Sequence, residues 1–129
     1  MGIFDKIFGG ASESKEEKTL PWIDLTSTSQ LDEIETKSKT KTQVIFKHST
    51  SCGISRMVKR QFVVTNDEDL NVDLYYLDLI AYREVSNETA NKFQVVHESP
   101  QLLIIKNGTV VKHTSHGGIN DVDLKEYLT

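Results

Sequence analysis

The sequence predicts a single α/β domain whose mixed central sheet is covered by helices on both faces. Two observations support this fold class. Strand-like and helix-like segments alternate through most of the chain, which favours parallel strands joined by crossover helices. Two β-rich segments then flank Asn107-Gly108, a dipeptide typical of a tight hairpin because both of its residues tolerate positive φ. The expected element order is βαβαβαββα.

The expected strands are rich in β-branched and aromatic residues, and they are residues 20–25, 43–47, 72–79, 102–106 and 109–113. Every residue between Gln43 and Lys47 is apolar, which suits a central strand covered on both faces.

Capping residues and apolar residues at helical spacing indicate the helices. They are expected to begin at residues 27–29, near Cys52, at Ser86 and at Ile119, with the first ending near Lys39 and the last at Leu128. The expected apolar stripe of the second helix is Ile54, Met57, Val58 and Phe62.

The 129 residues are enough for one domain and too few for two ordinary ones. Residues 1–19 contain a polar run that cannot bury much apolar surface, so they are predicted to form a flexible N-terminal segment. The folded domain is therefore expected to span residues 20–129.

The charge and hydropathy patterns exclude several classes of partner. A net charge of −4 argues against nucleic-acid binding, which requires clustered positive charge. No apolar run is long enough to span a membrane, and residues 1–10 lack the features of a secretory signal. We therefore expect a cytoplasmic protein that binds neither nucleic acid nor a membrane.

Cys52 is the only cysteine in the chain, so neither an internal disulfide nor a cysteine-rich metal site can form. The four histidines lack metal-binding spacing, and we expect neither a metal nor a tightly bound cofactor. A lone thiol is often an inert, buried side chain. Its place before a predicted helix nevertheless favours reactivity, because the helix N-terminus stabilises a thiolate. Lys47, His48 and Arg56 add positive charge nearby in the sequence.

Three features resemble the thioredoxin fold over residues 20 to the C-terminus. Cys52-Gly53-Ile54-Ser55 stands where that family has Cys-x-x-Cys. Ser99-Pro100 precedes a strand, where the family places a cis-proline beside the active cysteine. The Asn-Gly hairpin is followed by a glycine pair and a predicted terminal helix. The resemblance implies a thioredoxin-like domain.

A closer resemblance is to the bacillithiol-system, YtxJ-like family, also called monothiol bacilliredoxins. It is carried by the sequence TSCGIS at residues 50–55, by the spacing of Arg83, Ser86 and Asn87, and by HESPQ at residues 97–101. That family is cytosolic and is associated with removing bacillithiol from protein mixed disulfides. The resemblance implies bacillithiol as co-substrate, with S-bacillithiolated proteins and a low-molecular-weight thiol as partners.

The resemblance also implies roles for the residues around Cys52, which would be the attacking thiolate. Gly53 and Ile54 would contact the substrate, although many relatives have proline in place of Gly53. Ser55 stands in place of a resolving cysteine, and its hydroxyl either donates a hydrogen bond to the thiolate or bonds a nearby backbone group.

In thioredoxin-like proteins the residue before the cis-proline offers its backbone to the substrate, and Ser99 would do so here. The alternative is an ordinary trans Pro100 that opens an edge strand. His97 could donate a proton near the site, or could serve packing and hydrogen bonding alone.

Gly117-Gly118 resembles the glutathione-binding end of glutaredoxins, where a glycine pair admits the ligand and a helix N-terminus receives a carboxylate. Bacillithiol bears a malate with two carboxylates, which such a site would suit. Alternatively, the glycines only turn the chain and Asn120 or Asp121 caps the last helix.

Arg83, Ser86 and Asn87 are expected in a loop at the same sheet end as Cys52, where they could bind the sugar or malate of bacillithiol. The alternative for Ser86 is a helix cap.

The predicted function is monothiol exchange at Cys52. Two alternatives stay open. One is a non-catalytic thioredoxin-fold binding module with an unreactive Cys52. The other is a sensor in which bacillithiolation of Cys52 is the signal.

Overall fold

The computed structural model describes residues 19–128, so the predicted flexible segment lies outside the described residues except for Thr19. One five-stranded sheet has the order β2-β4-β3-β5-β6. The strands are β2 (Trp22–Asp24), β3 (Thr42–His48), β4 (Val72–Asp78), β5 (Gln101–Lys106) and β6 (Thr109–Ser115). β2, β4 and β3 are parallel, whereas β5 and β6 are antiparallel to their neighbours, as predicted for a mixed sheet.

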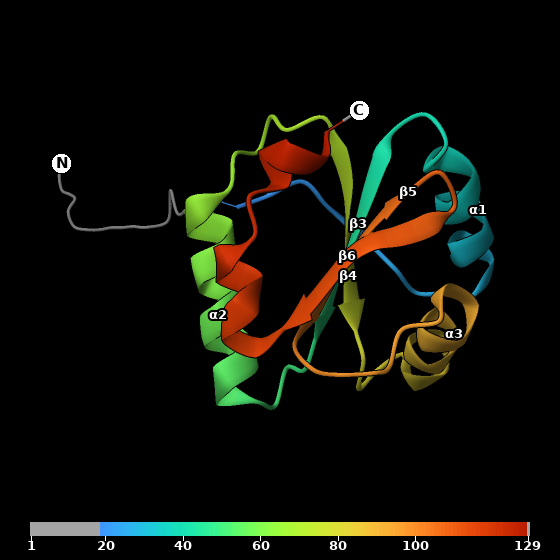
Figure 1. Cartoon of the computed structure of the whole chain (residues 1–129). Coiled ribbons are helices and arrows are strands. Elements are labelled where there is room, and N and C mark those ends of the chain that lie inside the picture. Colours follow the sequence, from blue (N-terminus) through green and yellow to red (C-terminus); the bar gives the residue numbers. More distant parts are fainter. Residues whose placement is uncertain (1–18, 129) are drawn as a thin grey trace, which may run out of the picture.

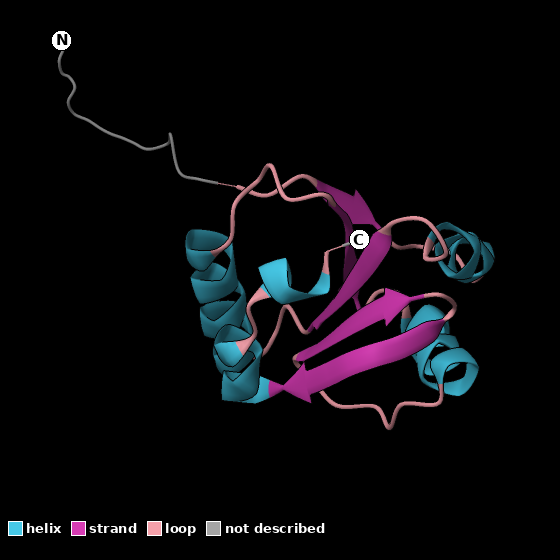
Figure 2. Ribbon diagram, turned by 45° about the horizontal axis from the view of Figure 1, so that its top comes forward, coloured by secondary structure: helices cyan, strands magenta, loops and turns pink. Residues whose placement is uncertain are grey.

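Helices cover both faces of this sheet (Figure 1). They are α1 (Ser29–Lys37), α2 (Gly53–Thr65), α3 (Arg83–Phe93) and the short 3-10 helices η1 (His116–Asp121) and η2 (Leu124–Tyr127). α2 and the C-terminal segment lie on one side, and α1 and α3 lie on the other (Figure 2).

Alternate residues of β3 face two separate cores. Phe46 belongs to the core that includes Val58 and Phe62 of α2. Ile45 belongs to the core that includes residues of α1 and α3, such as Ile34. Every residue of β3 is buried, which confirms the central strand expected from its apolar run.

The hairpin between β5 and β6 has the geometry that its sequence predicts. Asn107 and Gly108 have φ values of 54° and 82°, so both adopt the positive φ of a type I′ turn. The N–H of Asn107 donates to the Ser38 carbonyl at 2.7 Å, and that of Gly108 donates to the Ser38 hydroxyl at 2.8 Å. These bonds fasten the hairpin to the end of α1.

The predicted C-terminal helix from Ile119 to Leu128 is wrong. η1 and η2 replace it, and extended backbone at Val122 and Asp123 separates them. The Asp123 carboxylate accepts a hydrogen bond from the Lys125 N–H at 3.1 Å, which starts a new turn instead of continuing the first. Neither Asn120 nor Asp121 is a cap, because both lie inside η1.

The predicted start of the third helix is also wrong. α3 begins at Arg83, so Arg83, Ser86 and Asn87 lie in its first turns and not in a loop, and Ser86 is not its cap. Asp78, at the end of β4, organises this connection: its carboxylate accepts the N–H groups of Ile80 and Ala81 at 3.1 and 3.2 Å. This turn lets the helix begin earlier than a Ser cap would.

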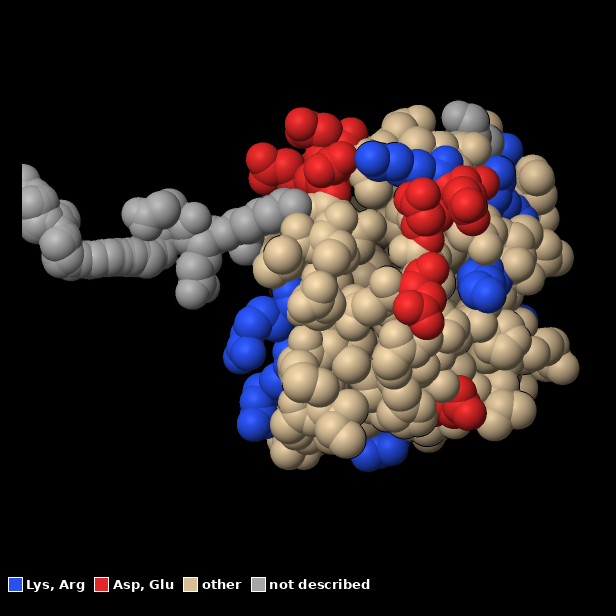
Figure 3. All heavy atoms as spheres, turned by 60° about the vertical axis from the view of Figure 1, so that its left-hand side comes forward, with Lys and Arg blue, Asp and Glu red and all other residues tan. Residues whose placement is uncertain are grey.

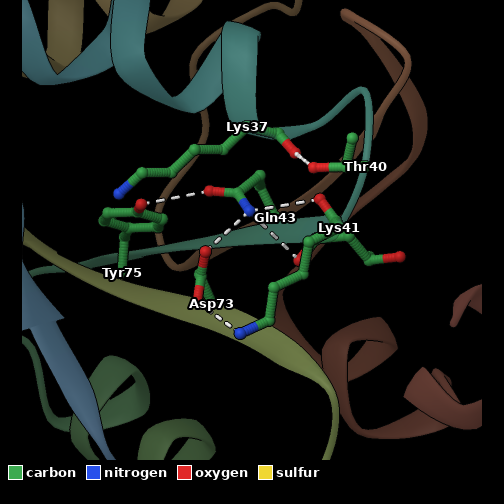
Figure 4. Close-up of polar contacts among 7 residues, drawn as sticks. Lys37, Thr40, Lys41, Gln43, Asp73 and Tyr75 are labelled. Atoms are coloured by element: carbon green, nitrogen blue, oxygen red, sulfur yellow. Dashed lines mark hydrogen bonds and ion pairs between the residues drawn. The ribbon is translucent and has the colours of Figure 1, made fainter. Parts of the chain in front are cut away.

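A polar cluster occupies the end of β3 at which the strand begins, with Gln43 and Tyr75 buried and Lys41 and Asp73 partly exposed (Figure 4). Gln43 donates to Asp73 at 2.8 Å and to the Lys41 carbonyl at 3.1 Å, and it accepts from the Tyr75 hydroxyl at 3.0 Å. Lys41 forms an ion pair with Asp73 at 3.0 Å. We call these four residues the glutamine cluster, and each charge within it has an opposite partner.

Candidate functional site

Cys52 lies at the opposite end of β3, which we call the cysteine end. The register pairs His48 with Asp78 and Lys47 with Gln101, so β3 and β4 stop where β5 begins. Cys52 is the half-buried N-cap of α2, and its carbonyl accepts the Arg56 N–H at 3.1 Å. The sulfur-bearing residue therefore stands at the positive end of a 13-residue helix that has no acid in its first turn.

Ser99 and Pro100 lie at the same end of the sheet. Their peptide bond is cis, and Pro100 directly precedes β5, whose first residue, Gln101, lies opposite Lys47. The buried Gln101 side chain donates to the Val96 carbonyl at 2.9 Å, which holds the loop before the proline. The Pro100 carbonyl accepts the first N–H of η1 at 3.0 Å.

The hydroxyl of Ser55 is engaged away from Cys52. It accepts the Ser49 N–H at 3.1 Å and lies 2.9 Å from Nδ1 of His48. Of its two open readings, the structure thus supports bonding to nearby groups and not to the thiolate. Ser55 is fully buried, so it holds the loop that carries Cys52 against β3.

Burial lowers the pKa of His48, and the charge of Lys59 lowers it further, with Asp78 opposing and Arg56 adding to the decrease. A neutral imidazole accepts through one ring nitrogen. The Ser55 hydroxyl has one hydrogen and two lone pairs, so it accepts from the Ser49 N–H and bonds Nδ1 of His48 in either tautomer of the imidazole.

Lys47 is a buried cation on the other face of β3. Its ammonium donates to the Ser86 carbonyl at 3.4 Å and lies 3.3 Å from Nδ1 of His97. Burial lowers the pKa of Lys47 to about 8. The pKa of His97 is lowered by burial and then by Lys47 and Arg83. His97 therefore links the loop before Pro100 to β3 and α3 by hydrogen bonds. Of the two roles expected for this residue, this is the one in hydrogen bonding.

Arg56 follows Cys52 by four residues, and its N–H donates to the Cys52 carbonyl. Its guanidinium donates to the Thr50 carbonyl at 3.1 Å. A Cβ atom at Gly53 would lie 3.8 Å from the same guanidinium. Arg56 thus folds back along the first turn of α2, beside the two chain segments that flank Cys52.

The remaining predicted residues are at the cysteine end but in different surroundings. Arg83 is exposed at the start of α3, on the side of His97. Gly117 and Gly118 lie inside η1 and not before a helix. A Cβ atom at Gly118 would overlap the Thr114 side chain, whereas one at Gly117 would meet nothing within 4 Å. Close packing therefore accounts for Gly118.

The predicted apolar stripe of α2 is wrong for two of its members. Ile54 and Met57 are 55% and 59% exposed, and Ser55 joins Val58 and Phe62 in the buried stripe instead. Ile54, expected to contact substrate, is thus accessible next to Cys52. Met57 was assigned to the core because apolar residues at helical spacing usually lie there.

Within residues 19–128, no group of three or more His, Cys, Asp or Glu side chains is arranged to hold a metal ion. None of the helices in this part of the chain has the length and apolar character needed to cross a membrane.

Comparison with solved structures shows the fold. A thioredoxin-fold protein described as an oxidoreductase shares 33% identity with a TM-score of 0.70, over 81% of this chain and 91% of that one. Thioredoxin from Trypanosoma brucei brucei has 17% identity and a TM-score of 0.65, over 84% and 89% of the two chains. Thioredoxin NaTrxh from Nicotiana alata has 21% identity and a TM-score of 0.64, over 92% and 95%.

Residues 23–124 match the family described as monothiol bacilliredoxin BrxC. This match covers both the cysteine loop and the Ser99-Pro100 segment. Together with the fold, it supports a role of the thiol–disulfide oxidoreductase type. The chain belongs to the monothiol bacilliredoxin BrxC family.

Proposed function

We propose that Cys52 removes bacillithiol from protein mixed disulfides by exchange at a single thiol. The observation that carries this proposal is the position of Cys52. The only cysteine of the chain caps the N-terminus of α2, is partly accessible, and shares one end of the sheet with Ser99 and the cis Pro100. The thiolate is the attacking form in such an exchange.

The reaction balances without an external oxidant or reductant in its first step. The Cys52 thiolate attacks the bacillithiol sulfur, and a disulfide bond forms between them as the bond to the substrate protein breaks. The substrate cysteine leaves with the electron pair and takes a proton from water. Cys52 then carries bacillithiol.

Regeneration requires a thiol from outside the chain, because Ser55 cannot displace a disulfide. A low-molecular-weight thiolate attacks the bacillithiol sulfur, which releases Cys52 and leaves a disulfide of two small thiols. The partners in this proposal are S-bacillithiolated proteins and a small thiol. We assign the reaction to the cytoplasm, where small thiols keep cysteines reduced.

A turnover experiment separates this proposal from a binding module and from a sensor. A small amount of the full chain is mixed with excess S-bacillithiolated protein and a low-molecular-weight thiol, and released substrate thiol is followed over time. An enzyme releases many equivalents per Cys52. A sensor releases about one equivalent of substrate thiol per Cys52, and a binding module releases none above the uncatalysed rate. Either of these two results would reject the proposal.

A further inference from the structure

A cation-lined groove of about 600 Å³ lies between α2 and β2. We call it the α2 groove, and the lining residues used here are Trp22, His48, Arg56, Lys59, Arg60 and Val63. Figure 3 shows several Lys and Arg side chains along the left edge of the molecule with no Asp or Glu side chain among them, while other Lys and Arg side chains lie beside Asp and Glu side chains at the upper right.

The groove lies one helical turn along α2 from Cys52, because its lining includes Arg56, four residues after Cys52. Residues four apart on a helix lie on the same face, so Cys52, Arg56 and Arg60 form one row, with Lys59 beside it. At about 1.5 Å per residue, Lys59 lies roughly 10 Å along the helix axis from Cys52. A small molecule attached to the Cys52 sulfur can therefore extend along this row.

Among residues 19–128, the cations of the α2 groove have no carboxylate partner. No acidic side chain from this part of the chain lines the groove, and neither Arg56, Lys59 nor Arg60 forms an ion pair within it. The Lys59 ammonium lies between aromatic rings, 5.5 Å from the centre of Trp22 and 5.2 Å from that of Tyr76. Burial lowers the pKa of Lys59 because the charged ammonium loses contact with water. An anion that entered the groove would offset this cost by pairing with the ammonium.

Asp78 and Asp24 act on Tyr76 beside the groove, and Asp78 also acts on the groove-lining His48, whose pKa it raises against the larger effect of burial. Burial raises the pKa of Tyr76, and the charges of Asp78 and then Asp24 raise it further. Asp78 already accepts two backbone N–H groups of its own turn. Among residues 19–128, the lining of the groove thus carries an excess of positive charge, in a chain whose net charge is −4.

We propose that the α2 groove binds the carboxylate-bearing part of the small thiol carried by Cys52, with Arg56, Lys59 and Arg60 pairing its carboxylates. This inference rests on the proposed function, in which that thiol is bacillithiol with its malate. It places the carboxylates on α2 and not at Gly117-Gly118. That glycine pair lies inside the short 3-10 helix η1 and does not precede a longer helix whose N-terminus could receive them. Three cations and an aromatic wall match a dicarboxylate joined to a sugar.

A kinetic experiment with paired reagents tests this assignment. The full chain reacts with the thiopyridine mixed disulfide of bacillithiol, or of an analogue in which a methyl group replaces malate. Cys52 attacks the small-thiol sulfur, a disulfide forms there, and thiopyridone leaves with the electron pair and a proton. We expect Lys59→Gln/Arg60→Gln to slow the reaction of the bacillithiol reagent about tenfold, and that of the analogue less than about twofold.

Lys112→Gln, an exposed charge change on β6, is the matched control and should leave both rates unchanged. Equal slowing of both reagents in the double variant, or no slowing of either, would overturn the groove assignment while leaving exchange at Cys52 intact.

Binding without chemistry gives an independent readout. Trp22 is the only tryptophan and lines the groove, so its fluorescence reports occupancy. In the Cys52→Ser chain, S-methyl bacillithiol should change the fluorescence in a saturable way, and its malate-free analogue should do so only at concentrations about tenfold higher. The Lys59→Gln/Arg60→Gln change should abolish this difference. Equal titrations by the two ligands would reject the groove assignment, whereas a failure of turnover alone would reject only the proposed exchange.

Discussion

Gln43 and Lys47 lie four residues apart on the same face of β3, and both are fully buried, yet their surroundings differ. Gln43 belongs to the glutamine cluster, in which the amide, carboxylate, phenol and ammonium groups all have partners. Lys47 has a backbone carbonyl and an imidazole nitrogen near its ammonium, but no carboxylate in an ion pair within the described residues.

The difference indicates which end of the sheet is structural and which is functional. Burial together with Asp73 and Glu33 raises the pKa of Tyr75 to about 12, so the glutamine cluster stays in one ionisation state over a wide pH range. At the cysteine end, burial holds the pKa of Lys47 and Lys59 below the usual value. A protein keeps such unbalanced charges at a cost in stability, which is common at sites that bind or react.

The largest effect that we expect is the loss of exchange in Cys52→Ser. A hydroxyl cannot attack a disulfide, so transfer of bacillithiol should fall to the uncatalysed rate while the midpoint of urea unfolding stays nearly unchanged. Ser51→Ala, at an exposed neighbouring residue, serves as the control and should retain transfer. Substantial transfer by Cys52→Ser would show that the cysteine end is not the reaction site.

Gln43→Ala should give the opposite pattern, with stability lost and chemistry kept. It leaves the buried Tyr75 hydroxyl without its acceptor and removes a hydrogen bond from Asp73. We expect the free energy of unfolding to fall by about 2–4 kcal/mol in urea titrations. The rate of exchange should remain within about twofold at temperatures where the variant is folded.

Gln61→Ala, the same substitution at an exposed site on α2, should change stability by less than about 0.5 kcal/mol. If the exchange rate fell in Gln43→Ala as sharply as stability, the proposed separation between the two ends of β3 would be wrong.

Lys47→Met should reveal the cost of the buried ammonium through its pH dependence. The pKa of Lys47 is about 8 in the folded chain and 10.5 ordinarily, so the unfolded chain binds more protons between these values. The free energy of unfolding of the natural chain should therefore rise with pH from about 8 to 10.5. Lys47→Met should be more stable by on the order of 1 kcal/mol at neutral pH, and this advantage should shrink across that window.

The measurement is urea unfolding of both chains at several pH values through this window. The comparison of the two chains cancels the titration of groups that they share. An advantage for Lys47→Met that stays constant with pH would mean that the Lys47 ammonium carries no desolvation cost.

The smallest effect concerns Gly53, the first residue of α2. Cys52 before it has φ −104° and ψ 123°, the extended conformation that a residue preceding proline prefers. Gly53→Pro should raise the free energy of unfolding by about 0.5–1 kcal/mol in urea, with Gly53→Ala giving a smaller gain. A loss of stability in Gly53→Pro would show that the first turn of α2 needs the freedom of glycine.

Local signals in the sequence predicted the strands, the hairpin and the start of α2, because each depends on residues close together along the chain. The hairpin needed only Asn107 and Gly108 to be recognised. The prediction of one continuous C-terminal helix was wrong because Asp123 forms a local cap that competes with it. The prediction of Ser86 as a helix cap was wrong because Asp78, eight residues earlier, organises the turn before α3.

The residues of the candidate site also fall into those that local sequence signals predict and those that they do not. Cys52 and Ser99-Pro100 were recognisable from their motifs. The α2 groove was not, because Trp22 and Lys59 meet only through tertiary packing of segments 37 residues apart in the sequence. The buried state of Lys47 was also hidden, since a lysine at the end of a strand normally reaches solvent.

The most direct test of the central claim is a single-turnover experiment followed by intact mass. Equal amounts of the full chain and an S-bacillithiolated protein are mixed without any other thiol. We expect the chain to gain the mass of one bacillithiol less two hydrogens at Cys52, while the substrate loses the same mass and gains one thiol. A disulfide between Cys52 and the substrate protein as the main product, or two unchanged masses, would contradict it.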